Sequence, residues 1–173
     1  MTTPTRRLRN APSGTFIGDP GLRVGPGCVG LIWRAHADSA PSQMPTGAAS
    51  SLDGLSAVAV DMQPGYLYQL EVSYPVYLAA TATANVDFSN YYRVHYASTS
   101  AWGSWVLMSN QTHSVQANAT FGNYVETTEK AFAVTVTAPI DMIGFGVLGG
   151  AVAAGVATIN NRGSWAIVSE YMA

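Results

Sequence analysis

The side chains that could act as acids, bases or metal ligands are few in this sequence and far apart. Its three histidines, His36, His95 and His113, have no partner at a metal-ligand spacing such as His-x-x-x-His. The Gly-x-Ser-x-Gly and Ser-x-x-Lys patterns of hydrolase nucleophiles and the Asp-rich pattern of calcium loops do not occur. No two of the ten acidic residues share an aromatic or glycine-rich context that would suggest a glycosidase cleft. We therefore expect a protein that is not an enzyme and that holds no metal or cofactor.

One nucleotide-binding pattern does occur, because Gly25, Gly27 and Gly30 spell Gly-x-Gly-x-x-Gly. That pattern binds phosphate where a strand precedes it and a helix opens from it. Here a segment rich in proline and glycine precedes the glycines, and a strand-like run follows them. We therefore interpret these glycines as turn formers.

Aromatic side chains offer the chemistry of recognition. Tyr91, Tyr92, Tyr124, Trp102 and Trp105 could form a platform on which sugar rings stack. Tyrosine and tryptophan are also enriched in protein interfaces and cores, and we favour that second interpretation for most of them. The residues that we retain as a candidate recognition surface are Tyr91, Arg93, His95, Trp102 and Trp105.

Positive charge is concentrated at the start of the chain. Residues 1–34 carry five arginines against one aspartate, a net charge of +4, whereas residues 35–173 carry three basic residues against nine acids, a net charge of −6. Three basic residues are too few for the groove that single-stranded nucleic acid requires, so we expect no nucleic-acid partner. The basic start predicts contact with a negatively charged partner, and the residues assigned to this contact are Arg6, Arg7, Arg9 and Arg23.

The segment that carries these four arginines must be extended. Residues 1–27 contain four prolines and five glycines. Proline lacks a backbone donor and glycine has little conformational preference, so neither a helix nor a central strand is expected there. We predict an extended basic arm over residues 1–27 and a single body over residues 28–173.

The body is organised around residues 65–97, where two runs alternate apolar and polar side chains. Tyr66, Tyr68 and Leu70 share one face of the first run, and Phe88 and Tyr92 share one face of the second. A period of two is typical of half-buried β-strands, and aromatic residues fit a pleated sheet well. Pro75 interrupts the first run, which predicts an edge, a bulge or a bend at that point.

Further strands are predicted at residues 28–35, 54–61, 104–109, 132–138 and 163–171, of which the segment 104–109 has apolar residues on both faces. Residues 110–129 are polar and predict an exposed hairpin or a long loop. Short strands separated by turn signals at intervals of roughly 8–12 residues favour an all-β fold. We predict a jelly-roll-like antiparallel β-sandwich with an extended N-terminal arm.

Residues 142–159 leave two alternatives open. They form a run of eighteen residues without a charge, which is the threshold for a membrane-spanning helix. The run also contains five glycines, with Gly149 and Gly150 near its middle. We favour a hairpin that turns at these two glycines, with a membrane-active segment as the alternative, and we expect no membrane partner.

The basic arm, the charge-poor body and the runs PGYLYQLEVSYPV, YYRVHYASTS and GSWAIVSEY resemble small virion proteins of tailed bacteriophages that infect actinobacteria. These relatives are head-decoration (cement) or head-fibre proteins, and some are tail components. The resemblance implies a jelly-roll body that forms a homotrimer on the capsid surface, with the small residues of segment 151–157 close to the trimer axis. It also implies an arm that runs across or between subunits of the major capsid protein, so that the partners are that protein and neighbouring copies of this chain. The alternative function is a tail-associated module that binds a host surface or a glycan.

Overall fold

The computed structural model describes residues 16–17, 29–80, 84–115, 123–149, 155–159 and 161–172. Within these ranges the chain forms thirteen β-strands and no helix. The strands are β1 (Phe16–Ile17), β2 (Val29–His36), β3 (Ser42–Gln43), β4 (Ser50–Ser51), β5 (Val58–Met62), β6 (Tyr66–Ala80), β7 (Ala84–Tyr96), β8 (Ala101–Trp102), β9 (Val106–Val115), β10 (Asn123–Val134), β11 (Ile140–Gly149), β12 (Gly155–Ile159) and β13 (Trp165–Met172). The predicted all-β class is confirmed.

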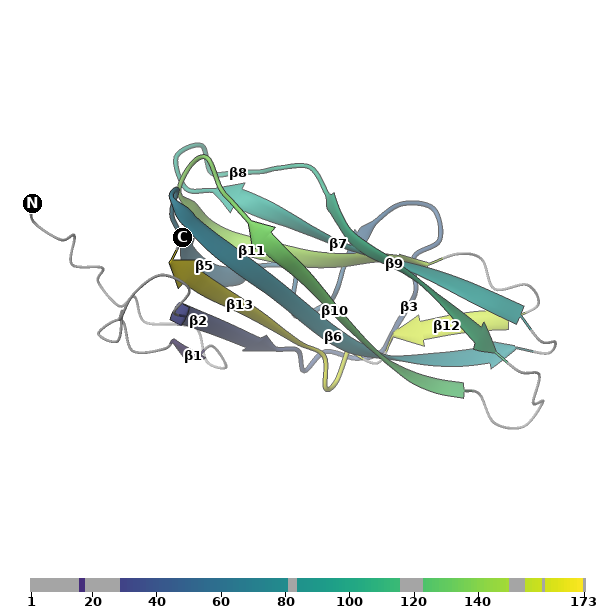
Figure 1. Cartoon of the computed structure of the whole chain (residues 1–173). Coiled ribbons are helices and arrows are strands. Elements are labelled where there is room, and N and C mark those ends of the chain that lie inside the picture. The colour runs from purple at the N-terminus through teal and green to yellow at the C-terminus, as the bar shows by residue number, and fades with distance from the viewer. Residues whose placement is uncertain are drawn as a thin grey trace, which may run out of the picture.

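The strands form two antiparallel sheets that lie face to face (Figure 1). The first sheet has the order β1-β2-β13-β6-β12-β3, and β10 also pairs with β6. The second sheet has the order β4-β11-β7-β8, with β5 paired to β11 and β9 paired to β7. The two long strands β6 and β7, which come from the stretch around which the sequence is organised, lie in different sheets. The predicted antiparallel β-sandwich is therefore confirmed.

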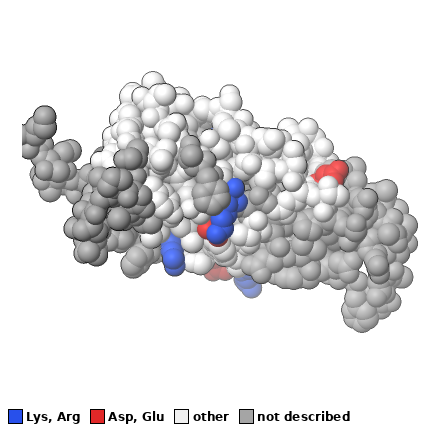
Figure 2. Space-filling view, in the orientation of Figure 1, with Lys and Arg blue, Asp and Glu red and all other residues white. Residues whose placement is uncertain are grey.

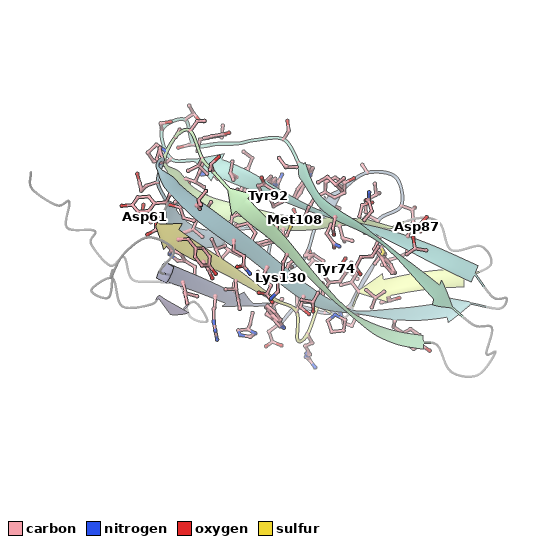
Figure 3. All side chains as sticks on the ribbon, viewed as in Figure 1. Asp61, Tyr74, Asp87, Tyr92, Met108 and Lys130 are labelled. Carbon is pink, nitrogen blue, oxygen red and sulfur yellow. The ribbon has the colours of Figure 1, made fainter. Side chains whose placement is uncertain are left out.

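The apolar faces of the two sheets meet in one core. Along β6 the side chains of Tyr68, Leu70 and Val72 are buried, as the alternation of the sequence predicts. Tyr92 of β7 and Met108 of β9 pack against this core from the second sheet (Figure 3). The largest fully buried side chains are Tyr68, Tyr74, Phe88, Phe145, Leu52, Leu55, Met62, Leu70, Ile140, Ile143 and Ile159.

The hairpin predicted for residues 142–159 is wrong in its pairing. Both halves are strands, β11 and β12, but β11 pairs with β7, β5 and β4, whereas β12 pairs with β6 and β3. The chain therefore crosses from the second sheet to the first between Gly149 and Gly155 instead of turning back on itself. Among the described residues no helix is long and apolar enough to cross a membrane.

Two other expectations are corrected by the strands β9 and β10. Residues 110–129, predicted as a hairpin or loop, contribute to both strands, and these two strands belong to different sheets. The segment 104–109 is not buried on both faces, because Val106 and Leu107 are 46% and 49% exposed. β9 pairs with β7, and no second partner for it is found within the described part of the sheet. The strand predicted at 132–138 ends earlier, at Val134, after a shift in register between Ala131 and Val134.

Pro75 lies inside the continuous strand β6, at the point where one neighbour of that strand replaces another. On one side of β6, the pairing with β13 ends at Ser73 and the pairing with β12 begins at Val76. Pro75 falls between these two ladders, where a missing backbone donor breaks no bond with either of them. On the other side it lies opposite Glu126 of β10. The proline is thus accommodated inside a continuous strand, at a position with no described ladder partner on one side, which agrees with the predicted edge in a local sense.

Part of the predicted arm belongs to a sheet. Phe16 and Ile17 form β1 and pair with Arg34 and Trp33 of β2. Outside the described residues lie Arg6, Arg7, Arg9 and Arg23. The same holds for residues 151–154, the first part of the segment 151–157 that the resemblance places close to a trimer axis. The assignment of these arginines to a partner stays a prediction.

A candidate recognition surface on the second sheet

Strand β7 supplies the central residues of the candidate site because its two faces differ. Phe88 and Asn90 are fully buried, and Tyr92 and Val94 pack against the core on the same face. Side chains alternate along a strand, so Arg93 lies on the opposite, outer face of the second sheet. The outer face is therefore where the recognition residues predicted from the sequence can meet.

Arg93 is enclosed by two tryptophans. Its Cζ atom lies 4.5 Å from the ring centroid of Trp102 and 4.5 Å from that of Trp105. Trp102 is held in β8, opposite His95 of β7, and Trp105 lies just before β9. A guanidinium over an indole face is stabilised by about 0.5–2 kcal/mol, depending on how far it is desolvated. We call Arg93, Trp102 and Trp105 the Trp–Arg–Trp cluster.

Two glycines of β11 provide the space in which the indole rings lie. In β11 the buried residues Ile143, Phe145 and Val147 face the core, and Gly144 and Gly146 alternate with them on the outer face. A Cβ atom at Gly146 would lie 2.7 Å from Cη2 of Trp105, and one at Gly144 would lie 3.3 Å from Cζ3 of Trp102. The absence of side chains at these two positions lets both indoles approach the sheet.

The guanidinium of Arg93 is only partly satisfied by hydrogen bonds. Nη2 donates to Oγ of Ser51 in β4 at 3.3 Å. The buried Nε atom has no hydrogen-bond partner among the described residues. No described carboxylate lies within 4.0 Å of this side chain, in contrast to Lys130, which pairs with Glu71 at 3.2 Å. The positive charge of Arg93 is thus compensated by two aromatic rings and not by a described counter-ion.

His95 extends the site toward an acidic residue. Its Nδ1 atom lies 2.6 Å from Oδ1 of Asp141, and its ring meets Trp102 edge-on with centroids 5.2 Å apart. From Ile140 to Met142 the chain of β11 advances by two residues while its partner β7 advances by one, from Tyr96 to His95, so Asp141 is the additional residue of a bulge against β7. Bulges redirect a side chain out of the regular alternation, and here the bulge lies at Asp141, which contacts His95. His95 is 8% exposed, whereas the side chain of Asp141 is 34% exposed.

Tyr91 borders the cluster on the same strand. It is half-buried and lies opposite Gly146 of β11 and Leu107 of β9. Trp105 packs over Gly146, the cross-strand neighbour of Tyr91, so Tyr91 lies next to the cluster. The structure therefore brings together all five residues that the sequence analysis retained, on one face of the second sheet.

Sequence reasoning missed Ser51, Asp141, Gly144 and Gly146. A signal for the glycines is present in the segment IGFGV, where glycine occupies both positions opposite the buried ones. Such a pattern indicates that something packs closely on the outer face. Ser51 and Asp141 carry no comparable signal, because a long-range pairing and a bulge place them. Among the described residues no group of three or more histidine, cysteine or acidic side chains could hold a metal ion.

Charged side chains are few on the described face of the molecule that Figure 2 draws. In Figure 2 most of the described face is white, with only a few blue or red side chains. This agrees with a sequence in which 10% of residues are charged and 48% are hydrophobic.

Comparison with known proteins finds similarity in fold alone. No protein-family model matches the sequence, and no curated protein matches it. The structure is similar to Eiger TNF from S. frugiperda, with a TM-score of 0.51 and 10% identity over 84% of this chain and 93% of that one. It also matches proteins from two infectious bursal disease virus structures: the T13 particle, with a TM-score of 0.44 and 11% identity, and the Gx strain, with 0.40 and 12%. This chain is covered over 82% and 91% in these two matches and spans 35% and 42% of the viral chains. The likeness to Eiger TNF, together with the two antiparallel sheets, shows that the fold is a jelly-roll β-sandwich, as predicted.

Proposed function

We propose that this chain is a non-enzymatic structural protein of a virion, located on the capsid surface, which it decorates and stabilises. The observation that supports this most directly is the charge-poor jelly-roll body, which exposes Tyr77, Val106 and Leu107 at 43–49%. A surface with few charged groups can be covered by a neighbouring protein at a low cost in desolvation, because few ions must lose their water. The sequence resemblance to head-decoration proteins supplies the particular partner, the major capsid protein, and a homotrimeric arrangement of neighbouring copies.

Attachment through the N-terminal arm follows from charge and from the absence of a core in that segment. Arg6, Arg7, Arg9 and Arg23 would form bidentate hydrogen bonds with capsid carboxylates. A protein that binds the assembled lattice but not the free subunits stabilises that lattice by mass action. Decoration and reinforcement are then one event.

The test is binding to particles that lack this protein, measured by co-sedimentation. Deletion of residues 1–15 removes Arg6, Arg7 and Arg9 but leaves β1 in place, so the body should keep its fold. We expect this variant to bind weakly and the intact chain to bind less as salt is raised. Arg162→Gln is the matched control, because Arg162 pairs with Asp38 at 3.4 Å on the exposed surface of the body. Undiminished binding by the deletion variant would refute attachment through the arm.

A second candidate function is recognition of a host-surface glycan by a tail-associated module. The Trp–Arg–Trp cluster is the observation that favours it, because it presents two half-buried indoles beside a cation on an outer face. Binding of the intact chain to cell-wall polysaccharide, lost in Trp102→Ala or Trp105→Ala with the fold retained, would support this function. An intact chain that binds no envelope polysaccharide would exclude it.

A further inference from the structure

The Trp–Arg–Trp cluster holds a cation whose charge no described carboxylate neutralises. Arg93 reaches across β11 to Ser51 and makes its one described hydrogen bond there, to a neutral hydroxyl. A guanidinium has five N–H donors in a planar fork, which suits a carboxylate far better than a single hydroxyl. We propose that this cluster is a binding site for a sugar ring that carries a carboxylate, such as a uronic acid. The inference rests on the second proposed function and names its ligand class.

The fixed geometry of Arg93 supports a site and not a mobile surface charge. The indoles of Trp102, on β8, and Trp105, just before β9, restrict the movement of the guanidinium. Ser51 on β4 accepts a hydrogen bond from its Nη2 atom. Gly144 and Gly146 let these groups pack closely against β11. A group that is already held in place loses less conformational entropy when a ligand binds, which improves affinity.

The surroundings of Arg93 favour a ring over a bare anion. Trp102, Trp105 and Tyr91 are each half-buried, so they expose aromatic surface next to the cation. Binding sites for small molecules combine such apolar surface with a few fixed polar groups. A pyranose ring offers C–H groups to the aromatic residues while its carboxylate meets the guanidinium.

The pair of His95 and Asp141 restricts the charge of the ligand. Asp141 is 34% exposed and lies beside His95 at the edge of the cluster, where it can accept a hydrogen bond from a sugar hydroxyl. Its negative charge repels any anion nearby, and this repulsion grows with the number of anionic groups that the ligand carries. One carboxylate on a ring with hydroxyls fits this arrangement, whereas a polyphosphate or a nucleic-acid backbone does not.

The direct test uses the intact chain on an array of acidic oligosaccharides, each printed beside its carboxyl-reduced counterpart. Reduction converts the carboxylate into a neutral alcohol and leaves the ring unchanged. We expect at least one acidic member to bind more tightly than its reduced form by about tenfold or more, as for a lost charged hydrogen bond. Equal binding of both forms would overturn the acidic-ligand inference and leave glycan recognition standing. No binding to either form would overturn both.

Variants then locate the site. Arg93→Gln should bind the acidic and the reduced forms equally, because the charge that distinguishes them is gone. Arg93→Lys should recover only part of the preference, since an ammonium keeps the charge but lacks the planar fork. Arg162→Gln, a distant surface arginine, should keep the full preference. A preference that survives in Arg93→Gln would overturn the site, and thermal melting checks the fold of each variant. The comparison of acid with alcohol on the unaltered chain remains decisive even where a variant fails to fold.

Discussion

Tyr74 of the first sheet and Asn90 of the second are joined by a hydrogen bond through the middle of the sandwich (Figure 3 shows Tyr74). Both side chains are 0% exposed. The phenol donates to Oδ1 of Asn90, and Nδ2 of Asn90 donates to Ser109 of β9 at 3.2 Å. This polar link spans the core and connects the two sheets.

Replacing Tyr74 by phenylalanine should measure the strength of this link. The ring stays, so the packing of the core changes little, but Oδ1 of Asn90 loses its donor where water cannot replace it. A buried polar group left without its partner costs about 1–3 kcal/mol of unfolding free energy. For a chain of this length that corresponds to a fall in Tm of roughly 2–12 °C.

The assay is thermal and urea unfolding of Tyr74→Phe beside the matched variant Tyr171→Phe. The hydroxyl of Tyr171 donates to Gln69 at 2.9 Å between two half-buried side chains, where water can take its place. We expect a loss of about 0.5 kcal/mol or less in this control. A further variant, Tyr74→Phe with Asn90→Leu, removes the unsatisfied amide and should recover part of the stability. If Tyr74→Phe costs no more than Tyr171→Phe, the reasoning about the buried link is wrong.

Two further predictions concern the second sheet. Gly146→Ala places a Cβ atom 2.8 Å from the carbonyl oxygen of Ser50 and 2.7 Å from Trp105, so it should cost about 1–3 kcal/mol and shift tryptophan fluorescence. The control is Gly47→Ala, where nothing lies within 4 Å of the added Cβ atom, and it should change neither the stability nor the tryptophan fluorescence. Equal effects of the two substitutions would contradict the close packing on β11. Burial raises the pKa of Tyr92 above its ordinary value, so the unfolded chain releases this proton first and stability should fall as pH rises through about 10 and above. The variant Tyr92→Phe should lose less unfolding free energy over that alkaline range, as measured by urea unfolding at a series of pH values. If the dependence of the unfolding free energy on pH is the same in the variant, burial of Tyr92 is not its cause.

Much of the sandwich could be predicted from local patterns. The buried faces of β6 and β7 were evident from the alternation of aromatic and polar residues, because a period of two records directly which side of a strand meets the core. The strand β2 was predicted at residues 28–35 and is found at Val29–His36. The residues of the candidate site were also selected from the sequence, since Arg93 and His95 stand opposite the core face of β7.

The errors concern which strand pairs with which. Residues 142–159 contain a pair of glycines that suits a hairpin, yet β11 and β12 lie in opposite sheets. The polar residues 110–129 suggested a loop, yet they continue two long strands that also lie in opposite sheets. A turn signal is local, whereas the choice of a partner strand depends on segments that are distant in the sequence.

The sequence by itself determined the class of fold, the faces of the central strands and the group of aromatic and basic residues that stand out from a charge-poor body. Only the tertiary structure decided that Arg93 lies between Trp102 and Trp105, that Gly144 and Gly146 make room for the indoles, and that a bulge places Asp141 beside His95. The physical reason is the range of the interactions. Alternation along one strand is set by neighbours two residues apart, but the cluster is assembled from β4, β7, β8 and β11, which meet only when the second sheet has formed.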